Sequence, residues 1–318
     1  MTLATICASH SPLMHEGVAT PETREDVAQA FAALADFVRR FSPDLIVMFW
    51  PDHFNGFFYD LMPAFCLGLR AHAIGDWDTR PGELPVPTDE AADLLAHLLQ
   101  GGIDIASSRR MSVDHGAVQI WEEMFGKDEP YPAPIVPIFV NCSAPPLPEY
   151  RRVRQLGKLV GDWAQNRSKR VLIVGSGGLS HDPPTPDIAT APAEVRERLI
   201  AGRNPTAETL AARKAFVLEA GAAAAQGLPP CMPLNPAWDA EVMDIFSGGR
   251  LAEFNAFEPK DVRGKAGRGA NEILTWVAAL SAQASAGAYE PDYQFYRAVD
   301  GWIAGMGMIA CRQRQATI

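Results

Sequence analysis

The amino-acid sequence predicts an α/β protein with a central mixed sheet flanked by helices and a helical C-terminal half. Three observations predict this fold. Short apolar runs alternate with longer amphipathic segments in the first half of the chain, and the second half is rich in helix-forming residues such as alanine. Histidines follow several of the apolar runs. Alternating strands and helices form a sheet covered on both faces, so we expect a single domain over residues 1–318.

The apolar runs of the first half are expected to be strands because each has the length of a buried strand. They cover residues 2–9, 45–50, 133–141 and 170–176. Between them, amphipathic segments predict helices at residues 21–41, 88–100 and 149–165. Pro43 ends the first helix, Thr88 is the expected N-cap of the second, and Gly101 follows its end.

The second half is expected to be mainly helical. Helix-forming segments cover residues 204–225, 236–249 and 270–283, and the first of them is especially rich in alanine. The tail from Tyr289 to Met308 is aromatic and contains glycines, so we expect it to fold back over the body of the protein or over a neighbouring subunit. The tail and the abundant apolar helices lead us to expect a homo-oligomer.

Charge and composition exclude several classes of protein. The formal net charge is −10, whereas nucleic-acid binding needs clustered lysines and arginines, so we expect no nucleic-acid partner. No apolar run approaches the roughly 20 residues of a membrane helix, and the N-terminus lacks the basic start of a signal peptide. The five cysteines are scattered without a CxxC pair, which fits a reducing compartment. We therefore expect a cytoplasmic protein that does not bind membranes.

Four of the seven histidines stand at the ends of apolar, strand-like runs, namely His10, His53, His115 and His181. A strand holds the side chains at its end in place at the edge of a sheet, where α/β proteins build their sites. Imidazole is the commonest metal ligand and a frequent general base near neutral pH. Convergence of these strand ends would therefore create a site that can both bind a metal and transfer protons.

The neighbours of these histidines allow more than one interpretation. Asp52 precedes His53 and could orient its ring beside a metal or simply cap the turn. Asp114 precedes His115 and could cap the following helix or tune the imidazole. Residues 175–178 (GSGG) match neither a Walker loop nor a GxSxG elbow. We expect these glycines to let the backbone pass close to a ligand or metal.

A mononuclear Fe(II) oxygenase needs two histidines and one carboxylate on one face of the metal. Glu272 stands near the start of a predicted helix, after a glycine-rich turn, and Asp239 and Glu241 lie in another helix. An acidic residue early in a helix commonly interacts with the helix dipole. Composition and position alone leave the choice among these three acids open.

Several longer motifs make the chain resemble the class III extradiol ring-cleavage dioxygenases over nearly its whole length. They are SHSPL at 9–13, PDHFNGFFYDLMPAFCLG at 51–68, GELPVP at 82–87, VDHG at 113–116, GSGGLSH at 175–181, LNPAWD at 234–239 and WIAGMG at 302–307.

The resemblance implies roles that spacing does not. His10 and His53 would be iron ligands, and Glu272 would be the carboxylate ligand. His181 would act as the base and His115 as the proton donor. The implied cofactor is Fe(II), and the implied reaction is extradiol cleavage of a catechol by O2. Expected substrates are 3-(2,3-dihydroxyphenyl)propionate or 2,3-dihydroxycinnamate, giving a muconic semialdehyde-type product.

Other interpretations stay open at this stage. The same chemistry could act on another catechol or on an aminophenol, because the fold does not decide the substrate. Histidine and glutamate ligands also suit zinc, so a metallohydrolase is an alternative. A non-catalytic relative that keeps the fold would lack at least one ligand, and none is missing here. Arg109, Arg110 and Arg268 lie near the motifs and could meet a substrate carboxylate, or could simply be charges exposed to solvent.

Overall fold

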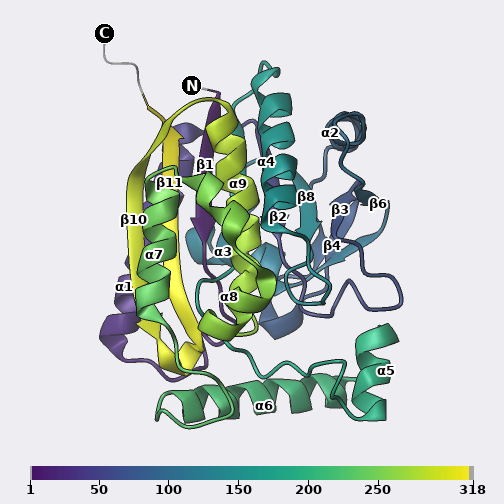
Figure 1. Ribbon diagram of the computed structural model, residues 1–318, viewed down its shortest axis with the longest axis vertical. Helices are drawn as coiled ribbons and strands as arrows, with labels where there is room; N and C mark the ends of the chain where they lie inside the picture. The colour runs from purple at the N-terminus through teal and green to yellow at the C-terminus, as the bar shows by residue number, and fades with distance from the viewer. Residues whose placement is uncertain (1, 315–318) are drawn as a thin grey trace.

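A computed structural model describes residues 2–314, and a large mixed sheet forms its centre (Figure 1). The strands of this eight-stranded sheet are, in chain order, β1 (Leu3–Ala8), β2 (Leu45–Trp50), β3 (Phe65–Gly68), β6 (Ala106–Ser108), β8 (Ile135–Val140), β9 (Val171–Ser176), β10 (Tyr289–Val299) and β11 (Ala304–Gln313). Their order across the sheet is β10-β11-β1-β9-β2-β8-β3-β6. The expected strands of the first half are confirmed.

The middle of the sheet is parallel, which decides where the site forms. Strands β1, β9, β2 and β8 are neighbours and run in the same direction. Their carboxyl ends therefore meet at one edge of the sheet. The antiparallel pairs β1–β11, β10–β11 and β3–β8 flank this parallel centre and make the sheet mixed, as expected.

Nine α-helices are formed by residues 2–314: α1 (Pro21–Phe41), α2 (Thr88–Gln100), α3 (His115–Phe125), α4 (Tyr150–Gln165), α5 (Ala193–Ala201), α6 (Ala207–Ala224), α7 (Pro236–Ser247), α8 (Pro259–Ala266) and α9 (Ile273–Ser285). Thr20 caps α1 by accepting a hydrogen bond from the Thr23 backbone N–H. The sequence predicted Thr88 as the N-cap of α2. In the structure Pro87 is the N-cap and Thr88 is the first helical residue. None of these helices combines the length and apolar character that crossing a bilayer requires.

Helices cover both faces of the sheet because side chains alternate along each buried strand. Ile6 and Met48 point to the face that packs against α1 and α3, and Cys7 and Val47 point to the face covered by α4 and α9. In Figure 1, α4, α7 and α9 lie in front of the sheet. Helix α6 lies across the bottom of this view with α5 at its right end, beyond the edge toward which β1 points.

The final segment adds strands where a helical half was expected. Helices do fill residues 193–285 apart from their connecting loops, but β10 and β11 then form an antiparallel hairpin that pairs with β1. The expectation that this tail folds back over the body is confirmed. A smaller sheet consists of β4 (Ala71–Ala73), β5 (Gly82–Glu83) and β7 (Met111–Val113). Its strand β7 directly precedes α3 in the chain.

Candidate metal centre and active site

The ends of the parallel strands bring the four predicted histidines into one cavity. Its volume is about 450 Å³, and its lining includes His10 after β1, His53 after β2, His115 at the start of α3 and His181 after β9. Glu272 also lines the cavity, at the end of the short 3-10 turn that leads into α9. All five predicted site residues therefore meet, although they come from distant parts of the sequence.

Three of the imidazoles form a tight group. Ring nitrogens of His10, His53 and His115 lie within 4.8 Å of one another, a spacing at which a metal ion could be held. The rings of His53 and His115 stack with centroids 4.3 Å apart, and the ring of His10 meets both edge-on at 5.4 and 5.5 Å. Because two imidazolium rings would repel at this distance, the group favours at most one protonated ring or a shared metal cation.

Hydrogen bonds fix the orientation of the His10 ring. The Ser176 hydroxyl donates its only proton to the Gly116 carbonyl oxygen, 2.6 Å away. The same hydroxyl lies 3.1 Å from His10 Nδ1, so it must accept a hydrogen bond from Nδ1–H. The His10 Nε2 atom then carries the free lone pair, which is the tautomer that a metal requires. Burial lowers the pKa of His10 to about 3, so this ring stays neutral at pH 7.

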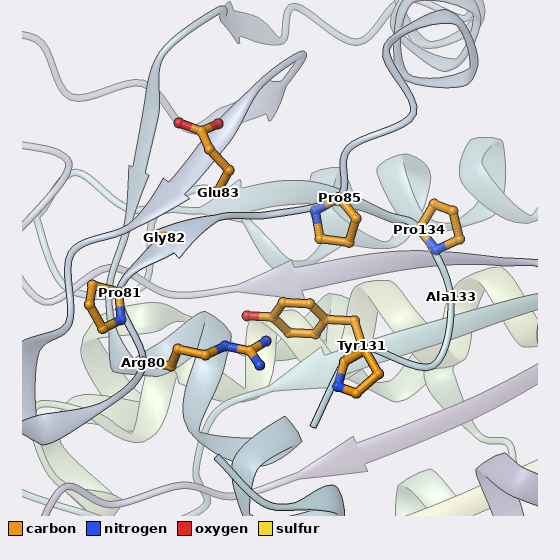
Figure 2. Close-up of a pocket in the computed structure, with 9 residues that line it drawn as sticks. Arg80, Pro81, Gly82, Glu83, Pro85, Tyr131, Ala133 and Pro134 are labelled. Carbon is orange, nitrogen blue, oxygen red and sulfur yellow. The ribbon is translucent and has the colours of Figure 1, made fainter. Parts of the chain in front are cut away.

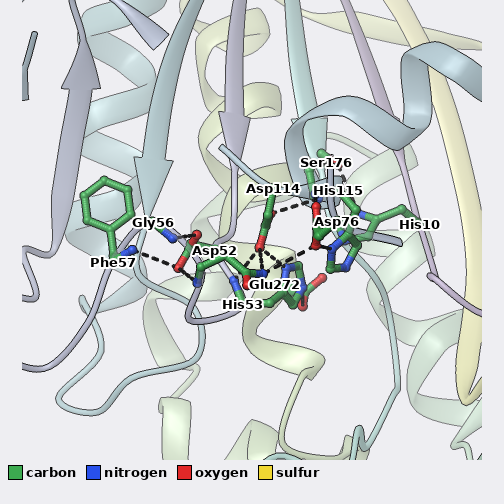
Figure 3. Close-up of polar contacts among 12 residues, drawn as sticks. His10, Asp52, His53, Gly56, Phe57, Asp76, Asp114, His115, Ser176 and Glu272 are labelled. Atoms are coloured by element: carbon green, nitrogen blue, oxygen red, sulfur yellow. Dashed lines mark hydrogen bonds and ion pairs between the residues drawn. The ribbon is translucent and has the colours of Figure 1, made fainter. Parts of the chain in front are cut away.

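Two carboxylates hold His53 and His115 in the same way (Figure 3). Asp114 Oδ2 lies 3.0 Å from His53 Nδ1 and accepts a second bond, of 2.8 Å, from the His53 backbone N–H. Asp76 Oδ2 lies 2.5 Å from His115 Nδ1, and its other oxygen accepts from the His115 backbone N–H. Each Nε2 atom is thus left as the atom available to a metal or substrate.

These contacts decide between the alternatives for the two aspartates. Asp52 caps the turn, because it accepts hydrogen bonds from the backbone N–H groups of residues 55–57. Burial and the charge of Asp114 raise the pKa of Asp52 to about 8. Asp114 caps α3 through the Gly116 N–H, as expected, but the imidazole that it tunes is that of His53 and not that of His115.

Glu272 connects two of the histidines. Its Oε1 atom lies 3.3 Å from His53 Nε2 and 3.1 Å from His181 Nε2, while Oε2 accepts a hydrogen bond from the Gly178 N–H. The Nδ1 atom of His181 lies 2.9 Å from the Leu179 carbonyl oxygen, so it must donate to that oxygen. Nε2, beside Glu272, is therefore the nitrogen of His181 that can gain or lose a proton.

The charges at this centre attract a cation. Burial alone would lower the pKa of His53, but Asp114 and Glu272 outweigh burial and raise it well above its usual value. Burial alone would raise the pKa of Glu272, but His181 and His53 lower it well below its usual value. Glu272 is 2% exposed and remains an anion. A buried anion among imidazoles suits a divalent metal ion better than a neutral ligand.

Two glycines allow the close approach of backbone and site residues. Gly177 has a φ of +145°, and a Cβ atom there would lie 2.9 Å from the Cβ of Glu272. A Cβ atom at Gly269 would lie 2.0 Å from His181 Nε2. Any side chain at either position would displace a site residue. Gly177, in the glycine run that was expected to let the backbone pass close to a ligand or metal, therefore lies against Glu272.

Several other candidates lie outside the site. Asp239 is a structural acid: it accepts hydrogen bonds from the hydroxyls of Ser180 and Tyr296. Glu241 is exposed on α7. Of the arginines near the motifs, Arg109 and Arg110 are exposed on the turn between β6 and β7.

Arg268 is held away from a substrate by a paired acid. Its Nε and Nη2 atoms donate to the two carboxylate oxygens of Asp182, at 2.7 and 2.9 Å. A further bond joins its Nη1 atom to the Thr185 carbonyl oxygen. This bidentate pair uses most of the donors of the guanidinium, so Arg268 is a structural residue here.

Sequence reasoning missed Asp76 and its loop. Gly75, Trp77 and Asp78 all have positive φ angles, of 77°, 51° and 62°, which bulky residues rarely adopt. Trp77 lines the cavity and its ring meets that of His115 at 6.4 Å. The loop contains a glycine beside two acids and an aromatic residue, but nothing in the sequence indicates that it reaches His115.

A second hollow of about 380 Å³ lies elsewhere on the surface, next to the small sheet (Figure 2). Four of its nine lining residues are prolines, and the Arg80 guanidinium lies 4.9 Å from the centre of the Tyr131 ring. Arg80 Nη1 also donates to the Glu129 carbonyl oxygen. No histidine lines this hollow, so it is not the candidate active site.

Comparison with known proteins agrees with the geometry. Residues 4–307 match a family described as the catalytic LigB subunit of aromatic ring-opening dioxygenase. The chain is similar to 2,3-dihydroxyphenylpropionate/2,3-dihydroxicinnamic acid 1,2-dioxygenases of several bacteria. Identity to the Rhodococcus rhodochrous protein is 48%, with 97% of each chain covered. Identity to the Photorhabdus laumondii protein is 45%, with 98% of each chain covered. Identity to the Azotobacter vinelandii protein is also 45%, covering 99% of this chain and all of the relative.

A solved structure shares the fold at low sequence identity. The crystal structure of an uncharacterized protein from Escherichia coli K12 superimposes with a TM-score of 0.50 at 14% identity, covering 96% of this chain and 98% of the other. This similarity concerns the fold alone. The resemblance to class III extradiol ring-cleavage dioxygenases rests on the family match and on the relatives.

The family match spans nearly the whole chain, and the imidazole group could hold a metal ion. These findings indicate a metal-dependent oxidoreductase that uses O2 to open an aromatic ring. The chain therefore belongs to the family of catalytic LigB subunits of aromatic ring-opening dioxygenases.

Proposed function

We propose that this protein is an Fe(II)-dependent extradiol dioxygenase that cleaves the ring of 3-(2,3-dihydroxyphenyl)propionate or 2,3-dihydroxycinnamate. The observation that carries the proposal is the convergence of His10, His53 and Glu272 beside His115 and His181 in one cavity. The names of relatives 45–48% identical over nearly the full chain support the substrate class. The product is a muconic semialdehyde-type compound that contains both oxygen atoms of O2.

The proposed iron ligands are Nε2 of His10, Nε2 of His53 and a carboxylate oxygen of Glu272. Two histidines and one carboxylate on one face are the ligand set of mononuclear Fe(II) oxygenases. Both rings have their Nδ1 atoms bonded to fixed partners, Ser176 and Asp114, so the Nε2 atoms are the ones that would face a metal. His53 Nε2 lies 3.3 Å from Glu272, the third proposed ligand. Iron bound there would polarise the catechol hydroxyls and enable electron transfer between the catechol and O2.

His181 is the proposed general base. Its Nδ1–H is committed to the Leu179 carbonyl oxygen, so Nε2 is the atom that accepts a proton from a catechol hydroxyl. Glu272, 3.1 Å from this nitrogen, stabilises the imidazolium that results. Burial alone would lower the pKa of His181, but the charge of Glu272 raises it, which strengthens the base.

His115 is the proposed proton donor for ring opening. The Asp76 carboxylate, 2.5 Å from its Nδ1, holds the ring in place and leaves Nε2 as the atom that delivers the proton. The stacked ring of His53 places this donor directly beside a proposed ligand. The proposed base thus contacts Glu272 and the proposed donor stacks on His53, so each lies beside a different proposed ligand.

We also propose that the whole chain, residues 1–318, is one catalytic domain that forms a homo-oligomer in the cytoplasm. The pairing of β1 with β11 supports a single domain, because it joins the two ends of the chain in one sheet. Exposed Leu61, Leu228 and Met232 support contacts between subunits. Free cysteines suit a reducing compartment. Sedimentation velocity tests the assembly, and a monomer at micromolar concentration would contradict it.

The decisive experiment measures oxygen uptake by protein reconstituted with Fe(II) in the absence of air. With 3-(2,3-dihydroxyphenyl)propionate we expect one O2 consumed per substrate and a yellow semialdehyde product. Plain catechol and an aminophenol serve as comparison substrates. The zinc-loaded protein should consume no oxygen. Conversion of substrate without oxygen uptake, or activity with zinc alone, would instead indicate a hydrolase and refute the proposal.

A further inference from the structure

Helices α5 and α6 form a wall of the cavity that contains the histidines. Arg198 and Leu199 of α5 line this cavity, as do Leu210, Arg213 and Phe216 of α6. Both helices lie beyond the ends of the parallel strands in Figure 1. A substrate whose hydroxyls face the imidazoles therefore has this wall within its surroundings.

Two arginines of the wall have no acidic partner. Within residues 2–314, neither Arg198 nor Arg213 has a carboxylate oxygen within 4.0 Å. Their neighbour Lys214 differs, because its Nζ atom pairs with Glu16 at 2.5 Å and with Asp78 at 2.9 Å. In a chain with a net charge of −10, two unpaired guanidinium groups in one cavity are a departure from the usual pattern.

The two arginines also lie close enough to repel each other. Burial and the positive charge of Arg198 lower the pKa of the Arg213 guanidinium. Both groups stay protonated, because a guanidinium is not deprotonated in proteins. Two like charges in a partly buried wall are unfavourable unless an anion lies between them. A carboxylate is suited to that position, because a guanidinium binds it through two parallel hydrogen bonds.

We propose that Arg198 and Arg213 bind the carboxylate at the end of the substrate's side chain and so determine specificity for acidic catechols. This inference rests on the proposed function. It replaces Arg109, Arg110 and Arg268, the candidates considered from the sequence, because those are exposed or already paired.

The charges and the apolar lining of the cavity orient such a substrate. Asp76, Asp114 and Glu272 surround the imidazoles and repel a carboxylate from that end. Leu199 and Phe216 belong to the same wall as the arginines and offer apolar contacts to the ring and its two-carbon linker. The hydroxyls therefore point to the metal centre and the carboxylate to the arginines.

The test compares an acid with its neutral counterpart. Oxygen uptake is measured for R198Q, R213Q and the double variant, with 3-(2,3-dihydroxyphenyl)propionate and with its primary amide. We expect the KM for the acid to rise roughly 10- to 100-fold, the loss typical of a hydrogen bond to a charged group. The kcat/KM for the amide should stay within about twofold. Equal losses for both substrates, or no change in the KM for the acid, would overturn the proposal.

The matched control is R196Q, an identical change two residues away on α5. Arg196 is exposed, donates to the Ala191 carbonyl oxygen and does not line the cavity. Its KM for the acid should equal that of the unaltered protein. A loss in R196Q as large as in R198Q would mean that general surface charge, and not a carboxylate site, governs the KM.

A binding measurement separates this inference from the proposed function. Calorimetry without oxygen measures 3-phenylpropionate, which has the carboxylate but no hydroxyls to react, against the iron-loaded protein. Binding that is lost in the double variant supports the arginine site even if no catechol is cleaved. Binding that is absent from the unaltered protein, or unchanged in the double variant, refutes the arginine site even if ring cleavage is observed.

Discussion

Two walls of one cavity are built in opposite ways. On the metal side, α9 is buried over every residue from Ile273 to Gln283, and the site residues follow buried strands. On the other side, α6 has only Ala220 and Gly221 fully buried among its 18 residues, and Leu210 and Phe216 are 43% and 51% exposed. The first wall is fixed by close packing and the second is held by few contacts.

The hydrogen bonds repeat this contrast. Each imidazole of the metal side is oriented through Nδ1 by a hydroxyl, a carboxylate or a carbonyl oxygen, whereas Arg198 and Arg213 have no acidic partner in the described part of the chain. Chemistry needs ligands positioned within fractions of an ångström, whereas a ring substituent can be accommodated by adjustable side chains. In the two proposals made above, reaction and substrate preference are therefore assigned to separate walls of the cavity.

The largest expected effect on activity comes from removing Glu272, the buried anion of the closely packed wall that α9 and the strand ends form. Glu272→Ala should abolish tight iron binding and reduce oxygen uptake to background, because a neutral pair of histidines cannot hold a ferrous ion alone. Iron content after desalting measures this. Glu241→Ala, an acid exposed on α7, is the control and should keep its iron. Stoichiometric iron in Glu272→Ala would transfer the ligand role to another group.

The two proposed proton-transfer residues come next. His181→Ala and His115→Ala should each lower the turnover rate about 10²- to 10⁴-fold while iron stays bound. Near-normal turnover in either variant would refute its role. Because His115 also belongs to the group of three close imidazoles, loss of iron in His115→Ala would indicate that this group, and not the set with Glu272, holds the metal.

A smaller effect on iron affinity should follow from removing the carboxylate that orients the His53 ring. Asp114→Asn keeps an oxygen for the Gly116 N–H at the start of α3 but removes the charge beside His53. Iron affinity should fall about 10- to 100-fold, as measured by competition with a chelator. Asp89→Asn, in the exposed first turn of α2, is the matched control. Unchanged affinity in Asp114→Asn would show that packing alone orients His53.

The smallest effect on activity should come from Arg268→Gln, which instead affects stability. Burial alone would raise the pKa of Asp182, but the bonds from Arg268 lower it. The variant should lose about 1–3 kcal/mol of unfolding free energy at pH 7, measured by urea denaturation, with an unchanged KM for the acid. Arg110→Gln, exposed on a turn, should lose none.

The pH dependence of that loss follows from the direction of the shift. A lowered folded-state pKa stabilises the protein fully above the unfolded value of about 3.9 and less as the pH falls through the folded value. The difference in unfolding free energy between Arg268→Gln and the unaltered protein should therefore shrink below about pH 4. A difference that grew on acidification would show that the pair with Asp182 is not its origin.

The sequence was sufficient for the parts of the molecule that depend on local pattern. Buried strands such as residues 45–50 are continuous apolar runs, and the parallel order that brings His10, His53 and His181 to one edge follows from alternation with helices. The family resemblance added the roles of Glu272 and the other site residues, which remain proposals for this chain.

The remaining features depend on contacts between distant segments, which periodicity does not encode. Asp114 reaches His53 across 61 residues of chain, and Asp76 reaches His115 across 39. The aspartates that orient these rings are therefore not their sequence neighbours, Asp52 and Asp114, and the sequence alone could not identify them. The tail from Tyr289 to Met308 was not predicted to form strands, because the edge strand β10 is largely half-exposed and lacks a clear apolar run. The buried strand β11 contains two glycines, which weaken the strand signal. Arg198 and Arg213 look like ordinary helical surface charges until the cavity is seen.

The pairing of the two chain ends has a consequence for biosynthesis. Strand β1 lies between β9 and β11, and His53 meets Glu272 across 219 residues of sequence. While the ribosome is still translating the middle of the message, the early histidines have neither their carboxylate neighbour nor the last strand of their sheet. The proposed ligand set of His10, His53 and Glu272 can therefore assemble only after almost all of the chain has been synthesised.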